Sequence, residues 1–136
     1  MQQKKSIHLS EEVRLLKNYI ELEKLRLNYT KVSFKTNAEE SNKDIPPLLF
    51  IPLVENAFKY NTDKLDTNIS INLNIKNNTL CFTVENSFDI KNTKTNSGGL
   101  GLSNLNKRLN LYFDKKYNYE IVIENSIYKA ILKLDI

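Results

Sequence analysis

The sequence is poor in the residues that build covalent cross-links and metal sites. Its 136 residues include one cysteine, Cys81, one histidine, His8, and no tryptophan. A single cysteine excludes an internal disulfide and a cysteine-based metal site, and a single histidine excludes a zinc site built from several histidines. Cys81 falls in a strand-like pattern, where we expect an inert, buried or half-buried thiol rather than a nucleophile.

Long apolar runs and a strong excess of one charge are also missing. No run approaches the ~18 apolar residues of a membrane span, and the N-terminus lacks the apolar core of a signal peptide. We therefore expect a soluble, reduced, intracellular domain. The 20 basic and 16 acidic residues give a net charge of +4. The lysines are scattered and form no basic stripe with interleaved aromatics, which argues against a nucleic-acid partner.

Helical and strand-like patterns follow one another along a chain whose length suits a single domain. The predicted helices cover 11–27, 46–60 and 100–113, and the predicted strands cover 29–36, 67–76, 80–84, 119–123 and 128–136. At least three strands alternate polar and apolar residues, so the sheet has one wet face and helices cover the other. The predicted fold class is α+β, a two-layer sandwich with a mixed sheet and helices on one face.

Local signals set the expected ends of these elements. Ser10 is a good N-cap for the first helix, and Glu11 and Glu12 follow where the helix dipole favours carboxylates. Asn77-Asn78 fits a two-residue hairpin turn. Pro52 removes a backbone hydrogen bond, so it either kinks the second helix or marks its true start.

Polar side chains end the otherwise apolar second helix. Asn56 and Lys59 are three positions apart and share a helix face, with Glu55 and Tyr60 beside them. An amide oxygen can bind Mg²⁺, an ammonium group can neutralise phosphate, and a phenol can lie against a base or sugar. The alternative is the ordinary polar end of a buried helix, and this segment alone does not decide between the two.

The glycines Gly98, Gly99 and Gly101 lie together at the start of the third predicted helix. They let the backbone approach an anion closely, and the free N–H groups of a helix start bind phosphate. No Gly-Lys-Ser/Thr follows, so this is not a Walker loop, and no strand leads into it, as a Rossmann fingerprint requires. A simple loop hinge is the alternative. Together, the two segments favour a site for a nucleoside triphosphate and Mg²⁺.

Three stretches resemble the C-terminal ATP-binding domain of bacterial sensor histidine kinases, which have the Bergerat fold of the GHKL ATPases. The resemblance is strongest to the LytS-type branch. Residues 9–27 resemble its linker helix, residues 45–60 its N box, and residues 98–109 its second glycine box with the following helix. The match covers nearly the whole chain. It implies a linker helix over 1–28 and a single ATP-binding catalytic domain over 29–136.

The resemblance implies roles on the phosphate side of the site. Asn56 would ligate Mg²⁺, Lys59 would contact phosphate, and Tyr60 would border the nucleotide. Glu55 is the candidate catalytic residue, which would orient or deprotonate the attacking group. The lid on the phosphate side and the start of the helix would be formed by Gly99, Gly101 and Leu102.

The adenine side departs from the family pattern. Asn86 stands where the family usually has an aspartate that accepts a hydrogen bond from the adenine amino group, and an asparagine oxygen can still accept it. The family's Asp-x-Gly is here Asn86-Ser87-Phe88. The missing glycine would narrow the adenine pocket or shift the lid.

The implied activity is that of a histidine protein kinase catalytic domain that binds ATP and Mg²⁺ and presents the γ-phosphate to a histidine upstream of this chain. His8 lacks the sequence context of a phosphoacceptor, so we interpret it as an exposed bystander. The implied partners are the protein's own dimerisation and phosphoacceptor helices, absent here, and a response regulator. The full-length protein would be a membrane homodimer with this domain in the cytoplasm, and the fragment alone would not autophosphorylate.

Two other functions remain open from the sequence. The first is a degenerate interaction module of the same fold that has lost nucleotide binding, which the stretch 86–88 motivates. The second is a stand-alone ATPase or serine kinase of this fold, which an intact Glu55 allows.

Overall fold

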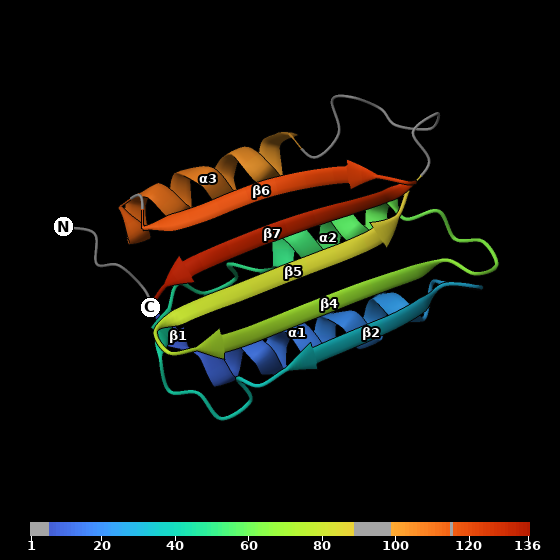
Figure 1. Ribbon diagram of the computed structural model, residues 1–136. Coiled ribbons are helices and arrows are strands. Elements are labelled where there is room, and N and C mark those ends of the chain that lie inside the picture. Colours follow the sequence, from blue (N-terminus) through green and yellow to red (C-terminus); the bar gives the residue numbers. More distant parts are fainter. Residues whose placement is uncertain (1–5, 89–98, 115) are drawn as a thin grey trace.

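The computed structural model describes residues 6–88, 99–114 and 116–136 (Figure 1). Its main sheet consists of β2 (Lys31–Thr36), β4 (Asn68–Lys76), β5 (Thr79–Ser87), β6 (Tyr117–Glu124) and β7 (Ile127–Asp135). The spatial order is β2-β4-β5-β7-β6. β2 runs parallel to β4, and the other neighbouring pairs are antiparallel. The sheet is therefore mixed, as predicted.

Three helices lie on one face of this sheet: α1 (Leu9–Lys24), α2 (Ile51–Tyr60) and α3 (Gly99–Phe113) (Figure 1). A small antiparallel pair, β1 (Ile7–His8) and β3 (Asp44–Ile45), lies beside the start of α1. Patterning did not predict these strands, because two residues are too short to show a period of two. The α+β two-layer sandwich with helices on one face is confirmed.

The alternating strands bury one face of the sheet. In β4, Ile69, Ile71 and Leu73 are at most 1% exposed, whereas Asn68 and Asn74 are exposed on the other face. Burying such side chains is the main stabilising term of the fold, at about 25 cal/mol per Å² of apolar surface. The centre of the core is aromatic, with the rings of Phe50 and Phe82 4.7 Å apart.

The start of α1 differs from the prediction. The helix begins at Leu9, so the prediction of Ser10 as N-cap is wrong, and His8 precedes it without a side-chain cap. The physical reason lies in a distant loop: the N–H groups of Leu9 and Ser10 donate to the carbonyls of Lys43 and Ser41 at 2.7 and 3.0 Å. These acceptors replace the hydroxyl that a cap would supply. The helix also ends earlier than predicted, at Lys24.

The prediction that the second helix begins at residue 46 is wrong, because α2 begins at Ile51 and Leu48 before it has φ 57°, which a helix does not allow. The ends of the remaining elements lie closer to prediction. Pro52 falls in the first turn of α2, where a missing N–H costs little, so it marks the start of the helix instead of kinking it. Asn77 has φ 57° in the β4–β5 turn, as a tight hairpin requires. α3 begins at Gly99, one residue before the predicted start. Among the described residues, no helix has the length and apolar character that crossing a membrane requires.

Candidate functional site

Three segments that carry the predicted site residues meet at one end of the molecule. The C-terminal end of α2, the C-terminal end of β5 and the N-terminal end of α3 all point to the same side (Figure 1). A backbone hydrogen bond ties two of them, because the N–H of Thr62 donates to the carbonyl of Ser87 at 3.2 Å. The structure thus brings together segments that are up to forty residues apart in sequence.

The polar end of α2 is held by a buried apolar face. Four side chains of the helix are buried: Leu53, Val54, Ala57 and Phe58. Glu55 and Lys59 are exposed, and Asn56 and Tyr60 are half-buried. The ammonium of Lys59 lies 5.2 Å from the centroid of the Tyr60 ring. Within the described parts of the chain, no hydrogen bond of the Asn56 amide is found, so its oxygen is an unused acceptor on a half-buried side chain.

Glu55 lies on the side of α2 that approaches α1. Burial raises the pKa of Tyr19 on α1 to about 12, and the charges of Glu23 and Glu55 act in the same direction. The Tyr19 ring also packs edge-on against Phe58, with centroids 6.4 Å apart. Glu55 is therefore an exposed carboxylate at the junction of the two helices.

Tyr60 at the end of α2 lies near Tyr128 of β7, which in turn lies near Tyr119 of β6. Tyr128 is paired with Asn86 in the β5–β7 register, and burial raises its pKa, with a smaller contribution from Tyr60. Burial likewise raises the pKa of Tyr119, with a contribution from Tyr128. Among the described residues, the hydroxyls of Tyr60 and Tyr119 are buried without a hydrogen-bond partner. Such hydroxyls are uncommon in proteins, and each of the two has unused hydrogen-bonding capacity.

Sequence patterning predicted Tyr60 but missed Tyr119 and Tyr128. Tyrosine is a common residue in strands, so its presence in β6 and β7 gives no functional signal. Strand register, which the sequence does not reveal, pairs Tyr128 with Asn86 and Tyr119 with Leu132.

Asn86 is 1% exposed near the end of β5. Its side-chain nitrogen donates to the carbonyl of Ser87 at 2.9 Å. In this orientation the amide nitrogen is occupied and the oxygen is the group left to accept a hydrogen bond.

Phe88 fills space that a glycine would leave empty. It is 6% exposed, its ring lies 5.7 Å from that of Tyr128, and its N–H donates to the carbonyl of Ser126 at 2.8 Å. Phe88 therefore adds a buried aromatic side chain close to Asn86.

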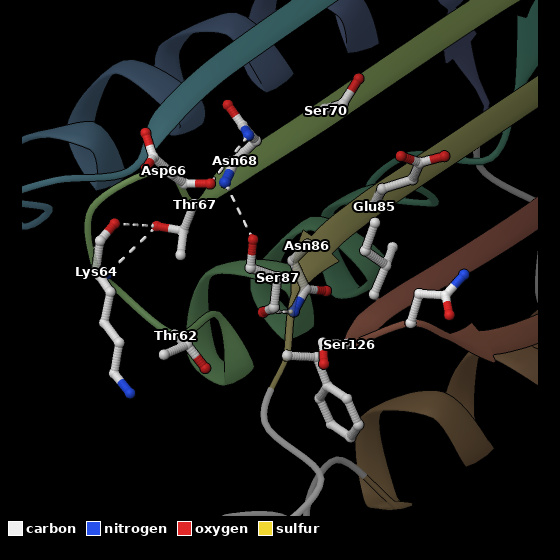
Figure 2. Close-up of a pocket in the computed structure, with 13 residues that line it drawn as sticks. Thr62, Lys64, Asp66, Thr67, Asn68, Ser70, Glu85, Asn86, Ser87 and Ser126 are labelled. Atoms are coloured by element: carbon white, nitrogen blue, oxygen red, sulfur yellow. Dashed lines mark hydrogen bonds between the residues drawn. The ribbon is translucent and has the colours of Figure 1, made fainter.

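A pocket of about 640 Å³ opens at this end of the sheet (Figure 2). Its described lining comes from the loop after α2, the facing ends of β4 and β5, and the β6–β7 turn: Thr62, Lys64, Asp66, Thr67, Asn68, Ser70, Glu85, Asn86, Ser87, Phe88, Asn125, Ser126 and Ile127. Asn86 is the predicted site residue in this lining, and the polar end of α2 does not contribute to it. The pocket and the α2 side chains are thus neighbouring features at one end of the molecule.

The predicted glycine segment lies in the first turn of α3. Gly99, Gly101 and Leu102 are helical, and Gly98 lies outside the described residues. The first N–H groups of a helix have no partner within it and carry partial positive charge, so they suit an anion. The segment is therefore a helix start, where a turn leading into a helix was predicted.

A metal ion here would depend on few protein ligands. The described residues contain no group of three or more histidine, cysteine, aspartate or glutamate side chains arranged to hold one. Mg²⁺ often takes one or two protein oxygens and completes its shell with phosphates and water. The open amide of Asn56 fits such a site.

Comparison with known proteins relates this chain to sensor histidine kinases. The chain is 28% identical over 128 residues to the sensor histidine kinase BtsS of Escherichia coli (strain K12), covering 92% of this chain. It is 26% identical over 127 residues to the sensor histidine kinase YesM of Bacillus subtilis (strain 168), covering 88% of this chain. A nucleotide-free catalytic domain of the histidine kinase ThkA superposes with a TM-score of 0.75 at 18% identity, covering 98% of both chains. The chain is thus similar in sequence to sensor histidine kinases and similar in fold to a histidine kinase catalytic domain.

The matched region is most of this chain but less than a quarter of each relative's length. The chain spans 23% of the length of BtsS and 22% of that of YesM. No protein-family model matches it. The sequence relationship is therefore to one part of each sensor histidine kinase, and the likeness to ThkA shows that the chain has the fold of a histidine kinase catalytic domain.

Proposed function

We propose that this domain binds Mg·ATP and presents the γ-phosphate to a phosphoacceptor histidine in another part of its full-length protein. The observation that carries the proposal is the meeting, in a histidine kinase catalytic fold, of the polar end of α2, the C-terminal end of β5 and the first turn of α3 (Figure 1). Asn86 belongs to that end of β5.

On the phosphate side, the open amide oxygen of Asn56 ligates Mg²⁺. The exposed ammonium of Lys59 contacts the phosphates, and the first-turn N–H groups of Gly99, Gly101 and Leu102 bind them from α3. Phosphoryl transfer depends mainly on positioning and on neutralising charge, which these groups supply. Glu55 lies next to Asn56 and is exposed, so it can reach an incoming imidazole and orient or deprotonate it.

On the adenine side, the side-chain oxygen of Asn86 accepts a hydrogen bond from the amino group of the base. Tyr60 borders the nucleotide, and its buried, unpartnered hydroxyl is satisfied there. The neutral amide replaces a charged carboxylate, so we expect this contact to be weaker, since hydrogen bonds to charged groups are roughly twice as strong.

The partners follow from the reaction. The domain acts on its own protein's dimerisation and phosphoacceptor helices, and the phosphoryl group then passes to an aspartate of a response regulator. The full-length protein is proposed to be a membrane homodimer that carries this domain on its cytoplasmic side.

A thermal-shift titration with a non-hydrolysable ATP analogue tests binding. With Mg²⁺ present and the analogue at a hundredfold excess over Kd, the domain should gain about 2.7 kcal/mol of stability. No shift at millimolar analogue would contradict the proposal and would favour an interaction module that has lost its nucleotide. Incubation with γ-labelled ATP tests the second half, because we expect no stable label on this chain.

A further inference from the structure

A buried carboxylate on α1 holds the turn that leads into α2. We name residues 46–50 the entry turn. Glu12 is 0% exposed, and its two oxygens accept the N–H groups of Leu48 and Leu49 at 3.2 and 3.1 Å. Leu48 has φ 57°, in the left-handed region that is uncommon for leucine. The Glu12 carboxylate therefore bonds the backbone of a turn whose conformation leucine does not favour.

The same turn is held from the opposite side by α3. The guanidinium of Arg108 donates to the carbonyl of Leu48 at 3.1 Å and to that of Pro47. Burial raises the pKa of Glu12, while the N–H groups of the turn and the charge of Arg108 lower it. One turn thus connects all three helices: its N–H groups bond to α1 and its carbonyls bond to α3.

A second carboxylate ties the other end of α2 to the turn that follows α1. We name residues 25–30 the exit turn. Asp63, three residues after α2, accepts the N–H groups of Asn28, Tyr29 and Thr30 at 2.8, 2.9 and 2.9 Å. It also accepts the Thr30 hydroxyl at 2.7 Å, and that hydroxyl accepts the Asn61 amide at 2.8 Å. Three successive N–H groups thus surround the two oxygens of one carboxylate. We call this contact, and the contact of Glu12 with the entry turn, the two joints.

The two joints lie at opposite ends of α2, and both attach it to the α1 segment. Between them the helices pack through the edge-on contact of Tyr19 with Phe58, and Leu16 and Ile20 belong to the same buried core. A displacement of α1 relative to the sheet therefore has to move α2 or break one of the joints. Asn56 and Lys59 lie between the joints, so their positions depend on both.

We propose that Glu12 and Asp63 are positioning residues that fix α2 on α1 from both ends, and that α1 thereby sets the geometry of Asn56 and Lys59. The functional half of this inference rests on the proposed binding of Mg·ATP. Its structural half, the clamping of α2, does not. α1 thereby supports the residues of α2 on the phosphate side of the site. A shift of the chain segment before α1 is passed to those residues through α1.

The structural half is tested without nucleotide. Glu12→Gln and Asp63→Asn keep side-chain volume but remove the charge and one of two acceptor oxygens, which leaves N–H groups unpaired. The controls are Glu21→Gln on the exposed face of α1 and Asp135→Asn at the exposed end of β7. Hydrogen exchange should become about tenfold faster in peptides from α2, equivalent to ~1.4 kcal/mol, while β5 changes less. Equal acceleration in α2 and β5, or α2 exchange at control levels, overturns the assignment for that residue.

The functional half is read from the Mg²⁺ dependence of nucleotide affinity. We define this Mg²⁺ dependence as the ratio of the nucleotide Kd in EDTA to the nucleotide Kd in Mg²⁺. Both are measured well below the melting temperature of each variant. Each positioning variant should lower this ratio at least fivefold, with the Kd in EDTA within twofold of wild type. General loss of stability does not change the ratio at such temperatures, so an unchanged ratio overturns the coupling. If the wild type binds no nucleotide, the proposed function fails while the exchange experiment still decides on the clamp.

Discussion

Removing the hydroxyl of Tyr119 should stabilise the nucleotide-free domain. Among the described residues this hydroxyl is buried and has no hydrogen-bond partner. An unpaired buried polar group costs about 1–3 kcal/mol, and phenylalanine keeps the ring and its burial. We expect Tyr119→Phe to raise the free energy of unfolding by ~1 kcal/mol, the low end of that range because the lost oxygen leaves a small void. That gain corresponds to about 3–5 °C in melting temperature.

Tyr117 on the same strand supplies a matched control. Its hydroxyl donates to the side-chain oxygen of Asn110 at 2.7 Å. Tyr117→Phe removes a hydrogen bond that is made, so it should lower the free energy of unfolding by ~1 kcal/mol. The two substitutions delete the same atom from the same strand, and the structure predicts opposite signs for them.

Urea unfolding of both variants and the wild type, followed by far-UV circular dichroism, measures the two changes. Equal m-values are required, because a changed m-value would report a different unfolded or native state. Destabilisation of Tyr119→Phe by as much as Tyr117→Phe would refute the reasoning, since it would mean that the Tyr119 hydroxyl has a stabilising partner in solution.

Two further predictions concern stability. The N–H groups of Asn28 and Tyr29 lower the pKa of Asp63 to about 2 from an ordinary value of 3.8. Ionised Asp63 therefore stabilises the fold above pH ~4, and this contribution is lost as the pH falls to 2. Asp63→Asn should flatten that part of the pH profile of the urea midpoint, and an unchanged profile would count against the joint. Phe50→Ala should cost about 3–5 kcal/mol, because Phe50 is 0% exposed. Leu65→Ala, at a side chain 76% exposed, should stay within about 0.5 kcal/mol, and similar unfolding midpoints for the two would contradict this placement of the core.

Local periodicity predicted the elements of the main sheet and its helical layer. In β4 and β5, for example, apolar residues recur at every second position, a pattern that can be seen in the sequence itself. It failed where a partner lies far along the chain. Ser10 has the right side chain for a cap, yet the carbonyls of the 41–43 loop take that role. Glu12 was interpreted as a first-turn carboxylate favoured by the helix dipole, whereas the structure buries it against a turn 36 residues away.

The candidate site likewise contains residues that sequence spacing predicts and residues that only the fold brings together. A spacing of three positions was enough to place Asn56 and Lys59 on one face of α2. Tyr119 and Tyr128 required the register of β6 and β7, and Asp63 required the approach of two turns that are more than thirty residues apart. These contacts have no counterpart in composition or spacing, so only the folded chain reveals them.

The most direct test of the account is a calorimetric titration of the domain with a non-hydrolysable ATP analogue, in Mg²⁺ and in EDTA. The wild type should bind in Mg²⁺ and more weakly in EDTA. Asn56→Ala should lose at least tenfold in the Mg²⁺-dependent part of the affinity, a change of ~1.4 kcal/mol or more. Asn74→Ala, on the exposed face of β4, should bind like the wild type. No heat from the wild type at millimolar analogue, or an Asn56→Ala variant that keeps full Mg²⁺ dependence, would contradict the proposed site.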